Sequence, residues 1–325
     1  MIRLTKVELR RLFARRLTLI GLVAALLGSG LMLFATYQES KPLPADQVAA
    51  SRIEFDRYSK SFPADLEQCK LQEAKQKETD PAAAMGCDQM VPPRWEDWIK
   101  PETVFSEAMP SYLLGGTYLL LFIAFLLGAG FIGAEYSSGA LGSWLTFEPR
   151  RLRVYASKLS AAFAGLVPMA IGFVALLIAG GWIIIDRNGS TAGMTGERWG
   201  DFAEIGLRVT LLTAVAAMLG VVIGGLFRHT AAALGLAMAY LVIVEGMLMG
   251  LVGNQQPWLL RLNFDSWIKH GTTYYVENCR QVDGYFNCES LEKQLSFGHS
   301  AVYLAVLTVV VVVLGAVVFR RRDVT

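Results

Sequence analysis

Residues 112–133 read YLLGGTYLLLFIAFLLGAGFIG and contain no charged side chain. A helix needs about 20 mostly apolar residues to cross the hydrocarbon core of a bilayer, and this stretch meets that length. Five further stretches are also long and mostly apolar, at 17–36, 159–185, 205–227, 231–252 and 301–319. The sequence therefore predicts an all-α polytopic membrane protein with six transmembrane helices, in agreement with an apolar content of 54% over 325 residues.

Basic residues are concentrated on one side of the six predicted spans. Fourteen Lys and Arg residues, against four Asp and Glu residues, lie in the segments 1–16, 134–158, 228–230 and 320–325. Because Lys and Arg accumulate in cytoplasmic loops, we expect these segments and both termini to be cytoplasmic in a multi-pass protein of a bacterial plasma membrane. The whole chain has a net charge of only +2, which argues against a nucleic-acid partner, since phosphate binding requires a basic face.

All four cysteines fall in segments that this topology places outside, and the external segments are 37–111, 186–204 and 253–300. Disulfides persist in oxidising compartments, so the cysteines agree with the orientation. Residues 279–288 read CRQVDGYFNC with Asp283-Gly284 at the centre, and Asp-Gly is typical of two-residue hairpin turns. Counting outward from that turn places Cys279 opposite Cys288 at a non-hydrogen-bonded pair, close enough for a disulfide. We therefore expect a small external β-hairpin closed by this bond.

The first external segment, 37–111, contains the other two cysteines, Cys69 and Cys87. They would pair by elimination, although a cross-pairing that ties the two external segments together is an alternative. Apolar side chains recur there at helical spacing, at Val48, Phe55, Tyr58 and Phe62. This spacing predicts a helical external domain.

Aromatic residues mark two further places near the predicted spans. Trp95 and Trp98 lie shortly before the second span, where an aromatic belt at the membrane interface is expected. In 253–300, aromatic residues surround Pro257 and Arg261, namely Trp258, Phe264 and Trp267. That arrangement suggests an interfacial or re-entrant stretch before the hairpin.

The N-terminal segment, 1–16, has an amphipathic pattern. Ile2, Leu9, Leu12 and Phe13 share one broad helical face, whereas most of the basic residues lie elsewhere. Such a segment suits a helix resting on the inner membrane surface, although simple positive flanking of the first span explains the charges equally well. Span 17–36 is too long for a cleavable signal peptide, so we expect it to remain as an anchor.

The sequence offers no catalytic or metal-binding motif. It has no phosphate-binding loop of the G-x-x-x-x-G-K-[ST] type and no H-E-x-x-H or Cys-x-x-Cys pair. His229, His270 and His299 fall in three different segments, so a catalytic zinc site is not expected. We therefore predict a chain that is no enzyme, contains no cofactor or metal of its own, and depends on a partner for any ATP-driven work.

The segment 134–158 between the second and third spans is unusual. From residue 128 the chain reads GAGFIGAEYSSGALGSWLTFEPRRLRVYASKLSAA. A charged residue, Glu135, arrives where the second span should leave the membrane, and a short apolar turn ends at Pro149. That turn is too short to span the bilayer, so we expect it to lie along the inner surface.

Seven residues of this segment resemble the cytoplasmic signature of permease subunits of type-2 ATP-binding-cassette exporters: Glu135, Gly139, Leu141, Leu145, Pro149, Arg151 and Lys158. In that signature a glutamate-glycine element precedes a proline, a basic residue and a lysine that opens the next span. The predicted topology resembles the family as well, with six spans, an inner-surface N-terminal helix and a large external segment before the last span. The external domain 37–111 is larger than the minimal family pattern.

The resemblance implies that 134–158 couples this chain to a separate ATPase. Two permeases, as a homodimer or paired with a relative, would each dock one ATPase subunit, and ATP and Mg²⁺ would bind in those subunits. Trp144, Leu145 and Phe147 would be apolar contacts, and Glu135 would brace the helix end. Anchoring of Trp144 and Phe147 at the membrane interface is the competing interpretation, and for Arg151 and its neighbours the competing interpretation is positive-inside topology.

Two charged residues lie inside predicted spans. Glu245 is deep in the fifth span and Arg208 lies near the outer end of the fourth. An ionisable residue at such depth is a functional-site hypothesis by default, so both are candidates for a substrate path. A polar contact between helices explains Glu245 equally well, and snorkelling explains Arg208 more simply.

The function predicted from these features is export of an amphipathic or hydrophobic compound, such as a drug, a peptide antibiotic or a lipid. A sodium or other small-cation exporter using Glu245 is one alternative. A non-transporting membrane anchor for an ATPase acting mechanically on envelope partners is another.

Overall fold

The computed structural model describes residues 2–79, 85–247, 253–282 and 285–322. Within these ranges, six helices are long and apolar enough to cross a membrane. They are α2 (Arg16–Ser40), α5 (Phe105–Ser137), α7 (Arg151–Asn188), α8 (Gly196–Phe227), α9 (Thr230–Ala239) with its π-helical continuation η2 (Tyr240–Met247), and α11 (Phe297–Arg321). The predicted all-α fold class with six membrane helices is confirmed.

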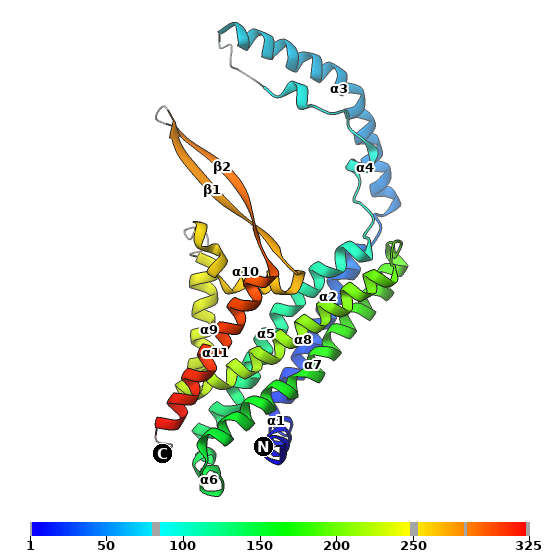
Figure 1. Ribbon diagram of the computed structural model, residues 1–325. Helices are drawn as coiled ribbons and strands as arrows, with labels where there is room; N and C mark the ends of the chain where they lie inside the picture. The colour runs from blue at the N-terminus through cyan, green and yellow to red at the C-terminus, as the bar shows by residue number, and fades with distance from the viewer. Residues whose placement is uncertain (1, 80–84, 248–252, 283–284, 323–325) are drawn as a thin grey trace.

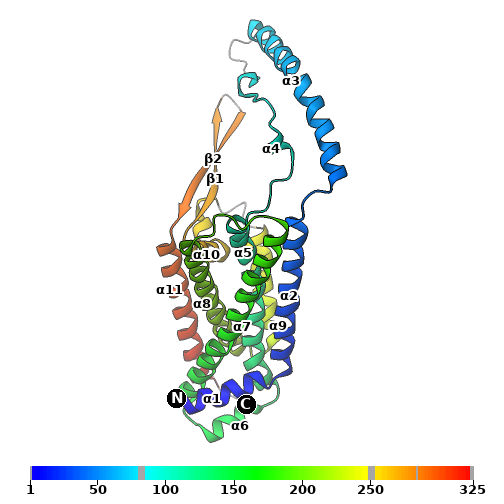
Figure 2. The same ribbon diagram turned by 90° about the vertical axis from the view of Figure 1, so that its right-hand side faces the viewer.

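The bundle has two distinct ends (Figures 1 and 2). Both chain termini lie at one end, beside the short helices α1 (Ile2–Phe13) and α6 (Ala140–Phe147), and we call this the terminal end. Helix α3 (Ala45–Thr79), the single turn α4 (Trp95–Trp98) and the β-hairpin project from the other end, which we call the hairpin end. The sequence segments that are rich in Lys and Arg thus gather at one end of the bundle.

The membrane helices extend beyond the apolar stretches that predict them. The helix expected at 205–227 begins as α8 at Gly196, where the Thr195 side chain accepts a hydrogen bond of 3.3 Å from the Arg198 amide. The last helix, α11, likewise begins at Phe297, capped by Ser296. Hydropathy marks the apolar part of a helix, whereas the caps determine where it ends. The end of the predicted fifth span, 248–252, lies outside the described residues.

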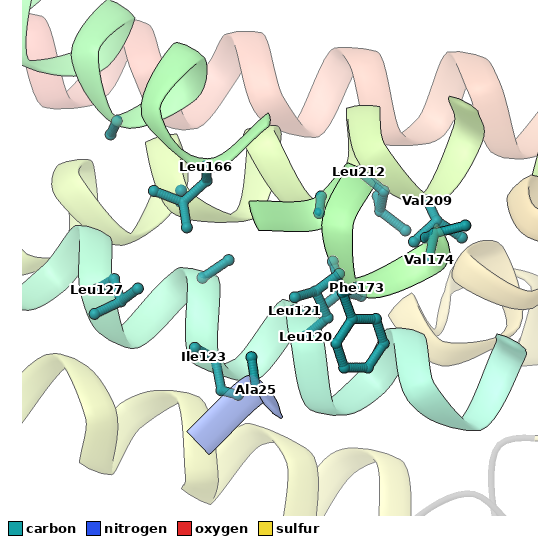
Figure 3. Packing of buried hydrophobic residues seen from close by; sticks show 14 of the residues in the cluster. Ala25, Leu120, Leu121, Ile123, Leu127, Leu166, Phe173, Val174, Val209 and Leu212 are labelled. Carbon is teal, nitrogen blue, oxygen red and sulfur yellow. The ribbon is translucent and has the colours of Figure 1, made fainter. Parts of the chain in front are cut away.

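Helices α5 and α8 form the centre of the bundle. In its most apolar window α5 is 67% buried, against 17% for α2 and 11% for α11. The core that surrounds α5 draws side chains from α2, α7 and α8, including Ala25, Phe173 and Leu212 (Figure 3). The outer helices therefore leave much of their apolar surface uncovered within this chain.

The central helices approach closely because glycines face each other's backbone. A Cβ atom added to Gly220 would lie 2.2 Å from the Phe125 carbonyl oxygen, and one added to Gly128 would lie 1.9 Å from that of Ala217. Gly224, one turn further along α8, is also close, since a Cβ added there would lie 2.7 Å from the Ala129 carbonyl oxygen. Small residues allow this approach between membrane helices.

Replacing Gly220 with Ala is expected to destabilise the chain by about 1–3 kcal/mol, the range for overpacking a filled core. The added methyl group must push α5 and α8 apart because its nearest neighbours are backbone atoms. Gly235→Ala in α9 is the matched control, since nothing lies within 4 Å of its added Cβ. Chemical unfolding in detergent would compare the two variants, and equal stability of both would contradict the packing.

The helical domain predicted in 37–111 is dominated by one long helix, α3. A disulfide joins Cys69 in α3 to Cys87 in the 3₁₀ turn η1 (Cys87–Gln89). Trp95 and Trp98 pack against Phe55, with ring centroids 5.5 and 5.9 Å away. The rings of both residues thus hold α4 on α3, and the membrane-interface belt stays a prediction.

The hairpin consists of β1 (Thr272–Val282) and β2 (Tyr285–Leu295), paired in antiparallel fashion. Cys279 lies opposite Cys288 and is bonded to it, with Val282 opposite Tyr285 at the turn. The predicted register and disulfide are confirmed, and the alternative cross-pairing of the four cysteines is wrong. The turn residues themselves, 283–284, lie outside the described residues.

Candidate functional site

The short helix α6 lies at the terminal end and connects α5 to α7 (Figure 1). Gly139, one of the predicted site residues, precedes it with a φ of +69°. That left-handed conformation is readily available to glycine, and it turns the chain from α5 into α6. Pro149 follows α6 as an exposed residue, and α7 begins two residues later at Arg151.

One face of α6 is packed against its own chain. Leu141 is fully buried, and Trp144 and Leu145 are partly buried against the core. The guanidinium carbon of Arg11 in α1 lies 4.3 Å from the centre of the Trp144 ring, within the range of a cation–π contact. These three predicted site residues therefore hold α6 in place.

The C-terminal end of α6 carries an exposed aromatic side chain. Phe147 is 84% exposed, among the most exposed large apolar residues of the described chain. Arg151, just beyond it, donates a hydrogen bond of 2.5 Å to the Arg322 carbonyl oxygen and so ties α7 to the end of α11. Of the predicted apolar contacts, Phe147 alone projects freely from the bundle.

Behind α6 lies a buried cluster of charges, which we call the base cluster: Glu8, Arg11, Arg15, Glu135 and Lys158. Lys158 Nζ lies 2.6 Å from Glu135 Oε2 and 3.0 Å from Glu8 Oε2. Arg15 Nη2 lies 2.9 Å from Glu135 Oε1. The base cluster thus joins α1 to the last turns of α5 and the first turns of α7.

Three members of the base cluster, Glu8, Glu135 and Lys158, are buried. The side chains of Lys158 and Glu8 are 0% exposed, and the Phe131 ring lies over the ammonium group of Lys158, 4.8 Å from its nitrogen. A charge removed from water without a partner costs several kcal/mol, so Lys158 is needed to compensate Glu8, and it shares Glu135 with Arg15. The two helices that flank α6 and the helix α1 are consequently fixed relative to one another.

Sequence reasoning found Glu135 and Lys158 but missed Glu8, Arg11 and Arg15 as site residues. A surface helix and positive flanking of the first span were the two explanations for the basic residues of 1–16, which include Arg11 and Arg15. Glu8 is the single acidic residue among the first 16. An acidic residue within a basic amphipathic segment was the available signal, because positive flanking alone does not account for it.

The two charged residues predicted for a substrate path do not meet. Glu245 Oε1 accepts hydrogen bonds of 2.8 Å and 3.3 Å from the Leu260 and Arg261 amides, which begin α10 (Leu260–Lys269). Arg208 donates 3.2 Å to the Ile268 carbonyl oxygen near the other end of that helix. Each charge therefore complements one end of the α10 dipole, and the helix lies where the sequence suggested an interfacial stretch.

Replacing Glu245 with Ala is expected to cost about 0.5–2 kcal/mol, the usual loss for removing a helix cap. The amides of Leu260 and Arg261 would lose their acceptor. Glu245→Gln should remain within a few tenths of a kcal/mol of the unmodified chain, because an amide oxygen also accepts. Unfolding in detergent would measure both variants, and an equal loss in both would show that the cap does not matter.

Two comparisons bear on the chain as a whole. The family model described as ABC-2 family transporter protein matches residues 4–324. No curated protein matches the chain. Among the described residues, no group of three or more His, Cys, Asp and Glu side chains is arranged to hold a metal ion.

Proposed function

Since the chain belongs to the ABC-2 family of transporter proteins, we propose that it is the permease subunit of an exporter driven by a separate ATPase. The permease itself contains no phosphate-binding loop, so the hydrolysing subunit would supply the ATP and Mg²⁺ sites. Two permeases, identical or related, would assemble with two ATPase subunits. The cargo would be an amphipathic or hydrophobic compound that leaves the cytoplasm or the inner leaflet.

The observation that carries this proposal is the way α6 is held. Its inner face is anchored by Leu141 and by Trp144 beneath Arg11, and the base cluster fixes the helices on either side. Its C-terminal end presents the exposed Phe147. A rigid projection of this kind could transmit movement of an attached ATPase to α5 and α7, whereas a loose loop would absorb it.

The orientation belongs to the same proposal. The terminal end would be cytoplasmic, since 14 of the Lys and Arg residues lie in the four segments gathered there. The hairpin end would be external, which agrees with the two disulfides of α3 and the hairpin. An ATPase supplied with cytoplasmic ATP then meets α6.

The test is mild detergent extraction of the tagged chain from its host, followed by mass spectrometry of co-purifying proteins and an ATP hydrolysis assay. The expected result is a stoichiometric ATPase whose activity falls when Glu135 is replaced with Ala. The matched control is Glu292→Ala, which removes an exposed carboxylate on the hairpin, at the opposite end of the bundle from α6. Absence of both an ATPase and hydrolysis would contradict the proposal.

A further inference from the structure

A cavity of about 840 Å³ opens between α5, α8, the α9–η2 helix, α10 and α11. Its walls are mostly apolar, with Phe122, Leu219, Leu236 and Val311 among them. Ligand pockets in proteins have volumes of about 300–1,000 Å³ and combine apolar walls with few polar groups. The cavity therefore has the size and lining of a binding site for a compound with a large apolar body.

One carboxylate lies in this wall. Glu245 is 6% exposed, and it belongs to the π-helical segment η2, a helix type found frequently at functional sites. Its Oε1 accepts hydrogen bonds from the Tyr240 hydroxyl at 2.7 Å and from the first two amides of α10. Three donors thus converge on Oε1, at the end of α10 where the helix dipole is positive.

The second oxygen of this carboxylate is not used. Glu245 Oε2 is buried and accepts no hydrogen bond from the described residues. No Lys, Arg or His of the described chain forms an ion pair with Glu245. A buried carboxylate oxygen without a partner carries a desolvation cost, which a cationic group entering the cavity would remove.

We propose that this cavity binds a lipophilic organic cation, with its positive group beside Glu245 and its apolar body against the walls. The identification of this compound as the exported cargo rests on the function proposed above. Its binding in the cavity does not depend on that function. The proposal narrows the cargo from amphipathic compounds in general to those with an ammonium-like charge. It also provides a partner for Oε2 of Glu245, because the cap of α10 uses Oε1 alone.

The other charges around the cavity are compatible with a cation. Arg261 also lines the cavity, but its side chain is exposed and makes contacts of its own, so solvent screens its charge. Asp265 accepts a hydrogen bond from the Tyr118 hydroxyl, a second polar group of the wall. Glu245 is therefore the buried charge that a ligand meets in the cavity.

The test uses the full chain in nanodiscs of phosphatidylcholine, without an ATPase, and two ions of similar shape and opposite charge. Tetraphenylphosphonium should bind saturably at one site per chain, and tetraphenylborate should not. Glu245→Gln should weaken binding of the cation by about tenfold or more, as expected for a charge-assisted contact out of water. It preserves an acceptor for α10, so a folded protein is expected.

Two further variants make the result specific. Ala237→Phe places a ring in the cavity wall and should abolish cation binding. Glu292→Gln removes an exposed carboxylate on the hairpin and should leave binding unchanged. Equal binding of both ions, or cation binding that survives Glu245→Gln, would overturn the proposal.

The same nanodiscs identify the source of the cation. If the amine of a phospholipid headgroup occupies the site, adding phosphatidylethanolamine should weaken tetraphenylphosphonium binding by competition. If a free lipophilic amine is the ligand, the added lipid should have no effect. Cation binding without any stimulated ATPase activity would contradict the exporter function and leave the binding site standing. A coupled ATPase without cation binding would overturn the binding site and leave the exporter function standing.

Discussion

Lys158→Met is expected to lower the free energy of unfolding by about 3–5 kcal/mol, the cost of breaking a buried ion pair by removing one partner. Lys158 Nζ contacts both Glu8 and Glu135, at 3.0 and 2.6 Å, with both carboxylates buried. Without the ammonium group, Glu8 loses the closest cation that the described residues offer it, since Arg11 Nη1 is 3.8 Å away. Chemical unfolding in detergent would measure the loss directly.

A second substitution shows how much of the lost stability comes from the unpaired charge and how much from lost packing. Adding Glu8→Gln to Lys158→Met removes the unpaired carboxylate and should restore part of the stability, because both partners are then neutral. Arg153→Met, an exposed site near the start of α7, should remain within about 0.5 kcal/mol of the unmodified chain. A Lys158 variant as stable as the Arg153 variant would show that the base cluster does not hold the terminal end together.

Phe147→Ala is expected to weaken docking of the ATPase by about 30-fold, since a buried aromatic anchor contributes at least ~2 kcal/mol to an interface. The stability of the isolated chain should not change, because Phe147 is 84% exposed and supports nothing within the bundle. Titrating the purified ATPase against the permease in nanodiscs, with hydrolysis as the second readout, would measure the effect.

The matched control for Phe147 is Leu152→Ala. Leu152 is also an exposed apolar residue near the terminal end, 46% exposed, but it belongs to α7. Its replacement should leave docking within about twofold, since most residues outside a hot spot contribute little. If both variants dock equally well, Phe147 is not the anchor.

The fold was largely predictable because a bilayer imposes a strong constraint. In an uncharged apolar stretch such as 112–133, the backbone N–H and C=O groups find hydrogen-bond partners within the bilayer by forming a spanning helix. In the hairpin, the Asp-Gly pair in the sequence predicts the register that brings Cys279 to Cys288. Helix ends were less predictable, as for α8, which extends through the charged residues 196–204 to the Thr195 cap. Hydropathy carries no information on a capping hydroxyl such as that of Thr195.

The candidate site was predictable only in part. The run from Glu135 to Lys158 identified the two residues that meet at 2.6 Å, but it could not identify Glu8, which comes from α1, 150 residues before Lys158. Trp95 and Trp98 show the same limit, because a tryptophan can pack on a distant helix as well as at a membrane interface. Pairing across such separations depends on tertiary packing, which no local pattern contains.

Glu245 and Arg208 illustrate a different limit. Their depth in predicted spans made both of them candidates for a substrate path, and the structure places them at opposite ends of α10. The sequence contained the two charges but not the orientation of a ten-residue helix whose dipole both of them complement. A charge inside a span can therefore have a helix end as its partner.

The central claim is that α6 is the surface on which an ATPase docks, and cross-linking from position 147 tests it most directly. A photoreactive amino acid would replace Phe147 in the host, and in a second sample Tyr275, which is 59% exposed on the hairpin. The account predicts that irradiation joins an ATPase subunit to position 147 and none to position 275. An ATPase captured from position 275 and not from position 147 would contradict it.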